Sequence, residues 1–262
     1  MAPNWSSTGC SLVFGFAALL LVQVIWAAPQ FSADTLQRGP DGKPVPGKLM
    51  VGDGRMRTEM VHQGQQIVRI SDDSRGVEWI LFPERKSYME NRMGVPGGQP
   101  ALRPSAEDPC AGMPNLTCTK RGEEAVAGRT AVAWDIVVAQ QGNTMKGTQW
   151  IDKERGPSFM LRQELPTGQK MERSLVGSEA LGNRQTEKWE ISMTGPDGQT
   201  VSTFEWYDPE LEMAIKQEFP GGMVSEMTNV RVGPQPDQLF GVPAGYERIS
   251  TPQGPSGGMP QR

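Results

Sequence analysis

Apolar and polar residues alternate along most of the chain from Val45 onward. Residues 55–60 read Arg-Met-Arg-Thr-Glu-Met, and residues 77–81 read Val-Glu-Trp-Ile-Leu. A period of two is the pattern of a β-strand whose two faces meet different surroundings. Turn-forming pairs such as Asp53-Gly54 separate these runs, and no stretch of ten or more residues keeps a helical spacing. The pattern therefore predicts an all-β chain of short strands with few or no helices beyond an N-terminal segment.

One sequence phrase occurs twice, 55 residues apart. Residues 122–136 and 177–191 share Gly-x-Glu-Ala, an arginine seven positions after the glycine, and a closing Trp-x-Ile. Each copy continues to Trp-x-Asp-x-Glu, at residues 150–154 and 206–210. A period of this size is typical of a duplicated supersecondary unit.

Within each copy, the two tryptophans are predicted to face one another across a hairpin. Antiparallel partners have a constant sum of residue numbers, and a two-residue turn at Asp197-Gly198 sets it at 395, the sum for Trp189 and Trp206. In the first copy, a three-residue loop at residues 141–143 sets this sum at 284, which is the sum for Trp134 and Trp150. Each pair would then share one sheet face. The neighbours predicted on these faces are Val132, Ile136 and Thr148 in the first copy and Ile191, Met193 and Phe204 in the second.

Two repeat units follow from this reading, residues 122–176 and 177–232. Each unit would hold four strands, and residues 45–90 would add a meander of about five. Roughly a dozen strands in chain order are typical of an open meander or an up-and-down barrel.

The first 28 residues contain no Asp, Glu, Lys or Arg, and Leu12–Trp26 is apolar except for Gly15 and Gln23. Residues 1–28 are therefore predicted to be a secretory signal peptide, cleaved near Ala27, which would place the protein in the periplasm or outside the cell. An uncleaved N-terminal membrane anchor is the alternative.

The remaining chain is predicted to form one β domain, residues 29–249, followed by a disordered tail. Residues 250–262 are rich in Pro, Gly, Gln and Ser and have no apolar run. The net charge is −4 and no basic patch occurs, so nucleic acid is not an expected partner.

Cys110 and Cys118 lie at the end of a Pro- and Gly-rich stretch, residues 95–118. A close, even pair of cysteines in a secreted chain favours a disulfide, with two free thiols as the alternative. No metal site is predicted, because the single histidine, His62, is far along the chain and zinc takes four ligands. No cofactor is predicted either.

The Trp-x-Asp-x-Glu segments offer the only carboxylate pairs that suggest catalysis. A glycosidase needs two carboxylates across a cleft, whereas an Asp at a strand end commonly caps a turn, which is the interpretation we favour. No Ser-His-Asp set, Gly-x-Ser-x-Gly or phosphate-binding glycine motif is present. The sequence therefore does not predict an enzyme. We assign the fifteen methionines to apolar packing rather than to copper binding.

The tryptophan pairs leave two interpretations open. They would pack a closed sheet core, or they would line the concave apolar face of an open sheet that takes a lipid or acyl chain. Arg57 would form a structural salt bridge with a neighbouring glutamate.

Several motifs together resemble a known family. They are Gly47-Lys-Leu-Met-Val51, residues 55–59, the Trp79–Tyr88 strand pair, the Gly-x-Glu units and the closing segment Pro236–Tyr246. They are similar to secreted bacterial proteins of the LolA/LolB-like lipoprotein-carrier superfamily, above all to its uncharacterised branch, in which a Cys…Cys loop precedes the Gly-x-Glu unit.

The resemblance implies an unclosed, strongly curved antiparallel half-barrel whose apolar concave face is covered by a helix or loop. The carriers hold lipoprotein acyl chains there, and the related regulator RseB uses the concavity to sense envelope stress. Arg57 matches an arginine that helps hold the carrier's lid, although recognisable lid helices are missing here and the Pro-rich loop takes their place. The residues expected to line a ligand are Trp134, Ile136, Trp150, Trp189, Ile191, Met193, Phe204, Trp206 and Arg57.

The expected function is therefore a binding or carrier module for an amphiphilic ligand, with a lipid or acylated protein as partner. The first alternative is a regulatory or scaffolding envelope protein that binds a protein partner. The second alternative is a propeller-like hydrolase.

Overall fold

The computed structural model describes residues 29–92, 104–113, 115–140 and 143–250. The predicted signal peptide, residues 1–28, and the predicted disordered tail, apart from Ser250, lie outside the described residues. Among the described residues, no helix is long and apolar enough to span a membrane.

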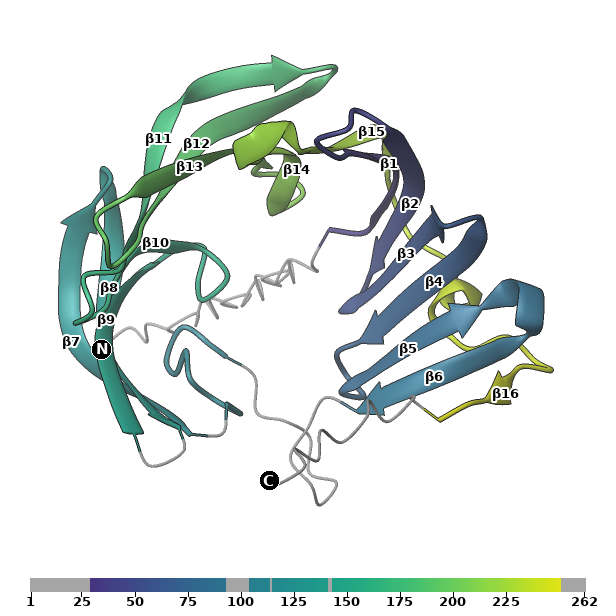
Figure 1. The fold of residues 1–262 in the computed structure, drawn as a ribbon, viewed down its shortest axis with the longest axis horizontal. Coiled ribbons are helices and arrows are strands. Elements are labelled where there is room, and N and C mark those ends of the chain that lie inside the picture. The colour runs from purple at the N-terminus through teal and green to yellow at the C-terminus, as the bar shows by residue number, and fades with distance from the viewer. Residues whose placement is uncertain (1–28, 93–103, 114, 141–142, 251–262) are drawn as a thin grey trace, which may run out of the picture.

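A single sheet of 16 strands makes up the fold. Figure 1 shows that this sheet curves into an open ring whose ends do not pair. The strands are β1 (Phe31–Arg38), β2 (Pro44–Gly52), β3 (Arg55–His62), β4 (Gln65–Asp72), β5 (Val77–Phe82), β6 (Ser87–Arg92), β7 (Leu116–Val126), β8 (Arg129–Gln140), β9 (Asn143–Asp152), β10 (Met160–Glu164), β11 (Lys170–Leu181), β12 (Arg184–Thr194), β13 (Thr200–Asp208), β14 (Met213–Glu218), β15 (Val224–Val232) and β16 (Glu247–Arg248). The predicted all-β, open and curved antiparallel meander is confirmed.

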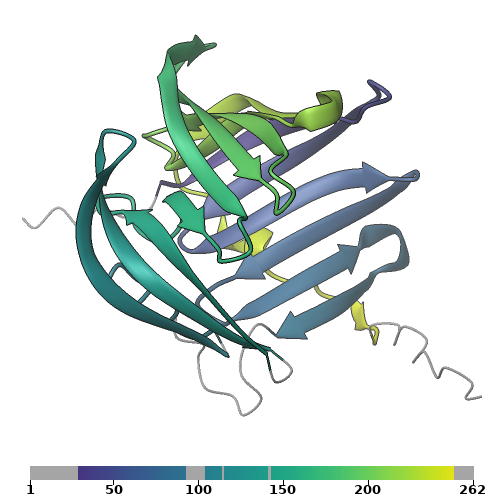
Figure 2. The same cartoon turned by 60° about the vertical axis from the view of Figure 1, so that its left-hand side comes forward.

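The order of the strands follows the chain except at two places. β1 lies between β2 and β15, which joins the first six strands to the later ones, and β16 pairs with β6 in parallel. Neither β1 nor β16 was among the strands predicted from the sequence. Figure 2 shows the strong twist between β7–β9 and β11–β13.

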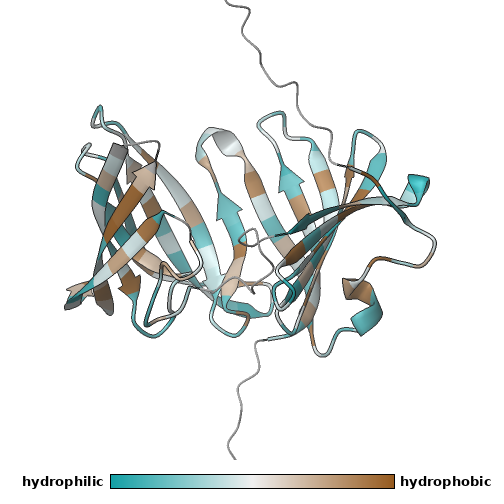
Figure 3. Ribbon diagram, turned by 90° about the horizontal axis from the view of Figure 1, so that it is seen from below, coloured by the Kyte–Doolittle hydropathy of each residue, from teal (hydrophilic) through white to brown (hydrophobic). Residues whose placement is uncertain are grey.

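Tight turns close several of the hairpins. Asp53 and Gly54 have φ values of 46° and 70°, and Ala127 and Gly128 have 52° and 76°. Two successive residues with positive φ match the right-handed twist of the flanking strands. Figure 3 shows hydrophobic and hydrophilic residues following one another along strands of the sheet.

The predicted register of both tryptophan hairpins is wrong by one residue. Trp189 lies opposite Glu205, and Trp206 lies opposite Lys188. Because side chains alternate along a strand, a shift of one residue moves a side chain to the other face, so Trp189 and Trp206 point to opposite faces. In the first copy Trp134 lies opposite Gln149 and Ala133 opposite Trp150, with the same consequence.

Hairpin loop length is the physical reason for this error. Gly195 donates its N–H to the carbonyl of Gln199 at 2.8 Å, so three residues, not two, form the second turn. In the first hairpin Gln140 pairs with Asn143, so the loop between the two strands has two residues, not three. The second hairpin is therefore the longer one, and this accounts for the offset of 56 between the later tryptophans.

The duplication is also visible in the strand irregularities. The register shifts between Lys120 and Gly122 in β7 and between Leu175 and Gly177 in β11. A shift of this kind is a β-bulge, which bends its strand. Each predicted repeat unit therefore begins at a bulge inside a long strand, not at a strand end.

The segment after β15 covers one face of strands β4 and β5. It contains a short 3-10 helix, η3 (Asp237–Phe240), and Phe240 packs with Val68, Ile70 and Trp79. Two other 3-10 turns are η1 (Pro83–Arg85) and η2 (Pro220–Gly222). Burying this apolar face of β4 and β5 stabilises the fold through the hydrophobic effect.

Candidate functional site

The repeated phrase forms the same set of side-chain contacts in both copies. The indole Nε1 of Trp150 donates to Glu124 at 2.9 Å, and that of Trp206 donates to Glu179 at 2.9 Å. Arg129 pairs with Asp152 and Glu154, and Arg184 pairs with Asp208 and Glu210. The residues that the two copies of this motif share therefore bind one another within each copy, and these contacts link the strands of that copy.

Both aspartates of Trp-x-Asp-x-Glu cap turns. Oδ1 of Asp152 accepts the backbone N–H groups of Glu154 and Arg155 at 2.9 and 3.0 Å. Oδ1 of Asp208 accepts those of Glu210 and Leu211 at 2.9 and 3.2 Å. The turn-capping interpretation is confirmed. In the described part of the chain, no three His, Cys, Asp or Glu residues are arranged to hold a metal ion.

Asp152 should make the fold sensitive to acid. Its burial opposes ionisation, but the hydrogen bonds from Arg129 and from two backbone N–H groups outweigh burial and lower the pKa of the carboxyl. Because the folded pKa is the lower one, the stabilisation is complete above the unfolded value of about 3.9 and is lost as pH falls through the folded pKa.

We therefore expect Asp152→Asn to cost about 1.5–3 kcal/mol of unfolding free energy at pH 7, and the difference from the wild type to shrink below about pH 4. Urea unfolding over a pH series measures it. Glu154→Gln is the matched control, because Glu154 binds the same arginine but its side chain is 82% exposed. A difference in unfolding free energy between Asp152→Asn and the wild type that stays constant across the pH series would contradict the expectation.

The four tryptophans of the repeat are buried, in different surroundings. Trp150 and Trp189 belong to one apolar cluster, in which the Phe159 ring meets Trp189 edge-on at 5.3 Å. Trp134 lies in a separate cluster with Val132, Ile151 and Cys118. Trp206 lies between the ammonium groups of Lys188 and Lys216, 4.5 and 4.2 Å from its ring. Ile136 is also buried. Apolar packing accounts for the burial of Trp134, Trp150 and Trp189, whereas the two lysines cover Trp206.

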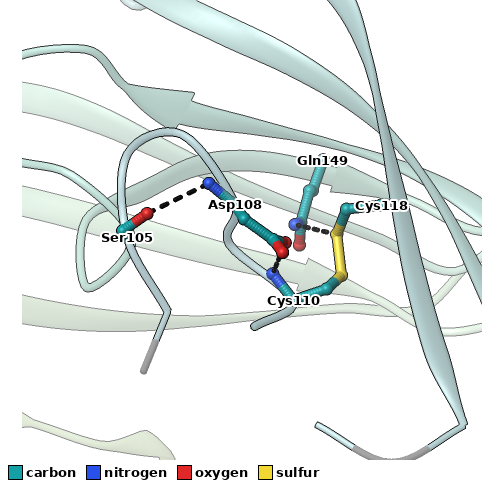
Figure 4. Close-up of a disulfide and its surroundings, with 5 residues drawn as sticks. All are labelled: Ser105, Asp108, Cys110, Cys118 and Gln149. Carbon is teal, nitrogen blue, oxygen red and sulfur yellow. Dashed lines mark hydrogen bonds between the residues drawn. A yellow bond between two sulfur atoms is a disulfide. The ribbon is translucent and has the colours of Figure 1, made fainter. Parts of the chain in front are cut away.

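The predicted disulfide between Cys110 and Cys118 is present, with its Cα atoms 5.7 Å apart (Figure 4). Gln149 donates to Sγ of Cys118 at 3.7 Å, and Asp108 accepts the N–H of Cys110. Since Cys118 packs in the cluster of Trp134, the disulfide ties segment 104–113 to that face of β7–β9. Residues 95–103 and 114 of the predicted loop lie outside the described residues.

Arg57 connects the sheet to the C-terminal segment. Its Nε lies 2.7 Å from Oε1 of Glu59, which confirms the predicted salt bridge, and its Nη1 donates to the carbonyl of Leu239 at 3.0 Å. Next to it, Arg55 pairs with Asp237 at 2.7 Å and lies 4.7 Å from the centre of the Phe240 ring. The contacts of Arg57 therefore hold η3 in place.

Exposed apolar side chains gather on one face of β10–β13. Gln163, Met171, Met193 and Val201 lie opposite one another in register across the four strands. Met193 and Val201 are each 52% exposed. These four residues and Leu165 line a hollow of about 400 Å³, whose rim is polar and consists of Gln169, Lys170, Thr194, Gly195 and Gln199. We call this surface the methionine face.

Two further predicted ligand residues lie on different sides of this sheet. Ile191 precedes Met193 by two residues, so it shares the methionine face, and it is half-buried. Phe204 lies opposite Glu190 and therefore points to the other face, together with Trp206. Of the nine expected residues, only Met193 lines the hollow, and Ile191 lies on the same face outside it.

A buried ion pair on the methionine face was not predicted from the sequence. Nη2 of Arg173 lies 3.3 Å from Oε1 of Glu205, and their side chains are 13% and 6% exposed. Burial raises the pKa of Glu205 and lowers that of Arg173. The two residues are 32 positions apart on strands that are not neighbours, so no local pattern would have linked them.

Comparisons with known proteins give low-identity structural matches only. No family model and no curated protein matches the chain. A DUF1329 family protein from Desulfovibrio piger is 13% identical, with 84% of this chain and 92% of that chain covered and a TM-score of 0.29. The MucA/MucB complex structure from Pseudomonas aeruginosa is 14% identical, with 81% and 90% covered and a TM-score of 0.23. A LolA superfamily protein from Nitrosomonas europaea is 10% identical, with 82% of this chain and 90% of that chain covered and a TM-score of 0.34.

Proposed function

We propose that the protein is a binding or carrier module for an amphiphilic ligand whose apolar part lies on the methionine face. The observation that carries the proposal is the hollow of about 400 Å³, whose volume lies within the ~300–1,000 Å³ range of ligand sites. Methionine suits such a surface, because its flexible thioether adapts to ligands of different shape.

The two faces of β10–β14 differ in the side chains that they expose. The face opposite the methionine face carries the partly exposed ion pairs Arg162–Glu172, Lys188–Glu179 and Lys216–Glu218. On the methionine face the Arg173–Glu205 pair is buried, and Met193 and Val201 are half-exposed. A contiguous exposed apolar surface commonly marks a binding site. We place the protein in the periplasm or outside the cell, after removal of residues 1–28.

Met193→Glu tests the site. A carboxylate in the hollow would have to lose its water when the apolar part of a ligand covers it, so we expect at least tenfold weaker binding. The probe is dansyl-undecanoic acid, whose fluorescence rises in apolar surroundings. Met223→Glu is the control, because Met223 is 42% exposed but lies outside the hollow.

The proposal predicts that the control binds the probe within about twofold of the wild type. Equal binding by all three proteins would place the ligand elsewhere. A wild type that binds no probe but retains a protein partner would favour the regulatory alternative.

A further inference from the structure

A second cleft, of about 580 Å³, lies between the β11–β12 turn and strands β14 and β15. The cleft forms because β14 pairs with only part of β15. That pairing reaches only from Glu218–Val224 to Lys216–Glu226, so β15 continues from Met227 to Val232 without β14 beside it. The turn at Gly182-Asn183 lies at the other side of the opening.

The cleft combines an apolar lining with two unpartnered polar groups. Leu181, Ile215, Met227 and Val230 supply the apolar part. The side chains of Asn183 and Thr228 are on exposed residues and form no hydrogen bond with the described part of the chain. An amide and a hydroxyl can each donate and accept, so together they suit a ligand that bears hydroxyl or amide groups.

All three charged residues of the lining are already neutralised by partners. Arg184 pairs with Asp208, and its Nη2 lies 3.0 Å from Oε2 of Glu210. Lys216 lies 2.7 Å from Oε1 of Glu218, and Glu226 lies 3.2 Å from Nη1 of Arg38. A charged head would compete with one of these pairs for its partner, whereas a neutral head leaves all three pairs in place.

We infer that this cleft is a second binding site, which takes a neutral amphiphile with a hydroxyl-bearing head and a short apolar tail. The apolar tail contacts Leu181 and Met227, which are partly buried, and the head exchanges hydrogen bonds with Asn183 and Thr228. The site is separate from the methionine face, so its ligand is independent of the proposed function.

NMR of protein labelled at the methionine methyl groups tests the site, with the full chain titrated by n-octyl β-D-glucoside below the concentration at which it forms micelles. The Met227 methyl reports on the cleft and the Met193 methyl on the methionine face. We expect a saturable shift at Met227. Octyl sulfate, which has the same tail and an anionic head, should bind there at least tenfold more weakly.

Two variants test the polar contacts. Asn183→Ala and Thr228→Val should each weaken glucoside binding about threefold to tenfold, the loss expected for one neutral hydrogen bond. Thr144→Val is the matched control, because Thr144 is also an exposed strand threonine, and it should bind like the wild type. Preserved methyl dispersion shows that each variant folds.

The site is overturned if the glucoside shifts neither methyl, if octyl sulfate shifts Met227 equally well, or if both cleft variants bind like the wild type. A shift at Met193 alone also overturns it, but leaves the proposed function standing. A shift at Met227 alone supports the cleft without supporting the methionine face.

Discussion

Replacing Trp189 with alanine is expected to lower the free energy of unfolding by about 3–5 kcal/mol, the range for removing a large aromatic side chain from a core. Trp189 is fully buried, packs against Phe159 and donates its indole N–H to Glu187 at 2.9 Å. The truncation would leave a cavity, and the Glu187 carboxylate would lose the hydrogen bond that the indole donates. Chemical unfolding with fluorescence and circular dichroism measures the loss.

Met193→Ala is the control for this prediction. Met193 lies four residues further along the same strand face, but it is 52% exposed, so its truncation should cost less than about 1 kcal/mol. The two variants separate packing from ligand contact, because only Met193 is proposed to touch a ligand. Comparable losses of stability would contradict the assignment of Trp189 to the core and Met193 to an open surface.

Removing one partner of the Arg173–Glu205 pair is the second change with a large expected effect. Either Arg173→Met or Glu205→Leu leaves a buried charge without its counter-charge, which typically costs about 3–5 kcal/mol. The pKa directions of both groups show that burial already disfavours their charged forms.

The double variant Arg173→Met/Glu205→Leu should recover most of this loss, because neither charge remains. Unfolding free energies of the four proteins at pH 7 form a double-mutant cycle. Losses that simply add would show that the two side chains act independently, contrary to the geometry.

Much of the fold was predictable because strand formation leaves a local signal. The alternation at residues 77–81 corresponds to β5, in which Val77, Trp79 and Leu81 are buried. The capping role of Asp152 and Asp208 was predictable for the same reason, since the turn follows each aspartate directly in sequence. The disulfide followed from the close spacing of its two cysteines.

The face of each tryptophan was not predictable, because it depends on hairpin loops that differ by one residue. The sequence around Asp197-Gly198 fits a two-residue turn, but Gly195 and Gln199 close a longer one. A shift of one residue changes the face of Trp206 and Phe204 but leaves the strand pattern intact. The contact between Arg57 and Leu239 was hidden for another reason, since 182 residues separate the two.

Lipid mass spectrometry tests ligand binding on the methionine face most directly. The protein is purified from cells that express the full-length gene, extracted with organic solvent and compared with its Met193→Glu variant. We predict an acyl-containing amphiphile in near-equimolar amount in the wild type, and its strong depletion in Met193→Glu. A wild type that carries no such compound, and takes up none when incubated with a membrane lipid extract, would contradict the proposed function.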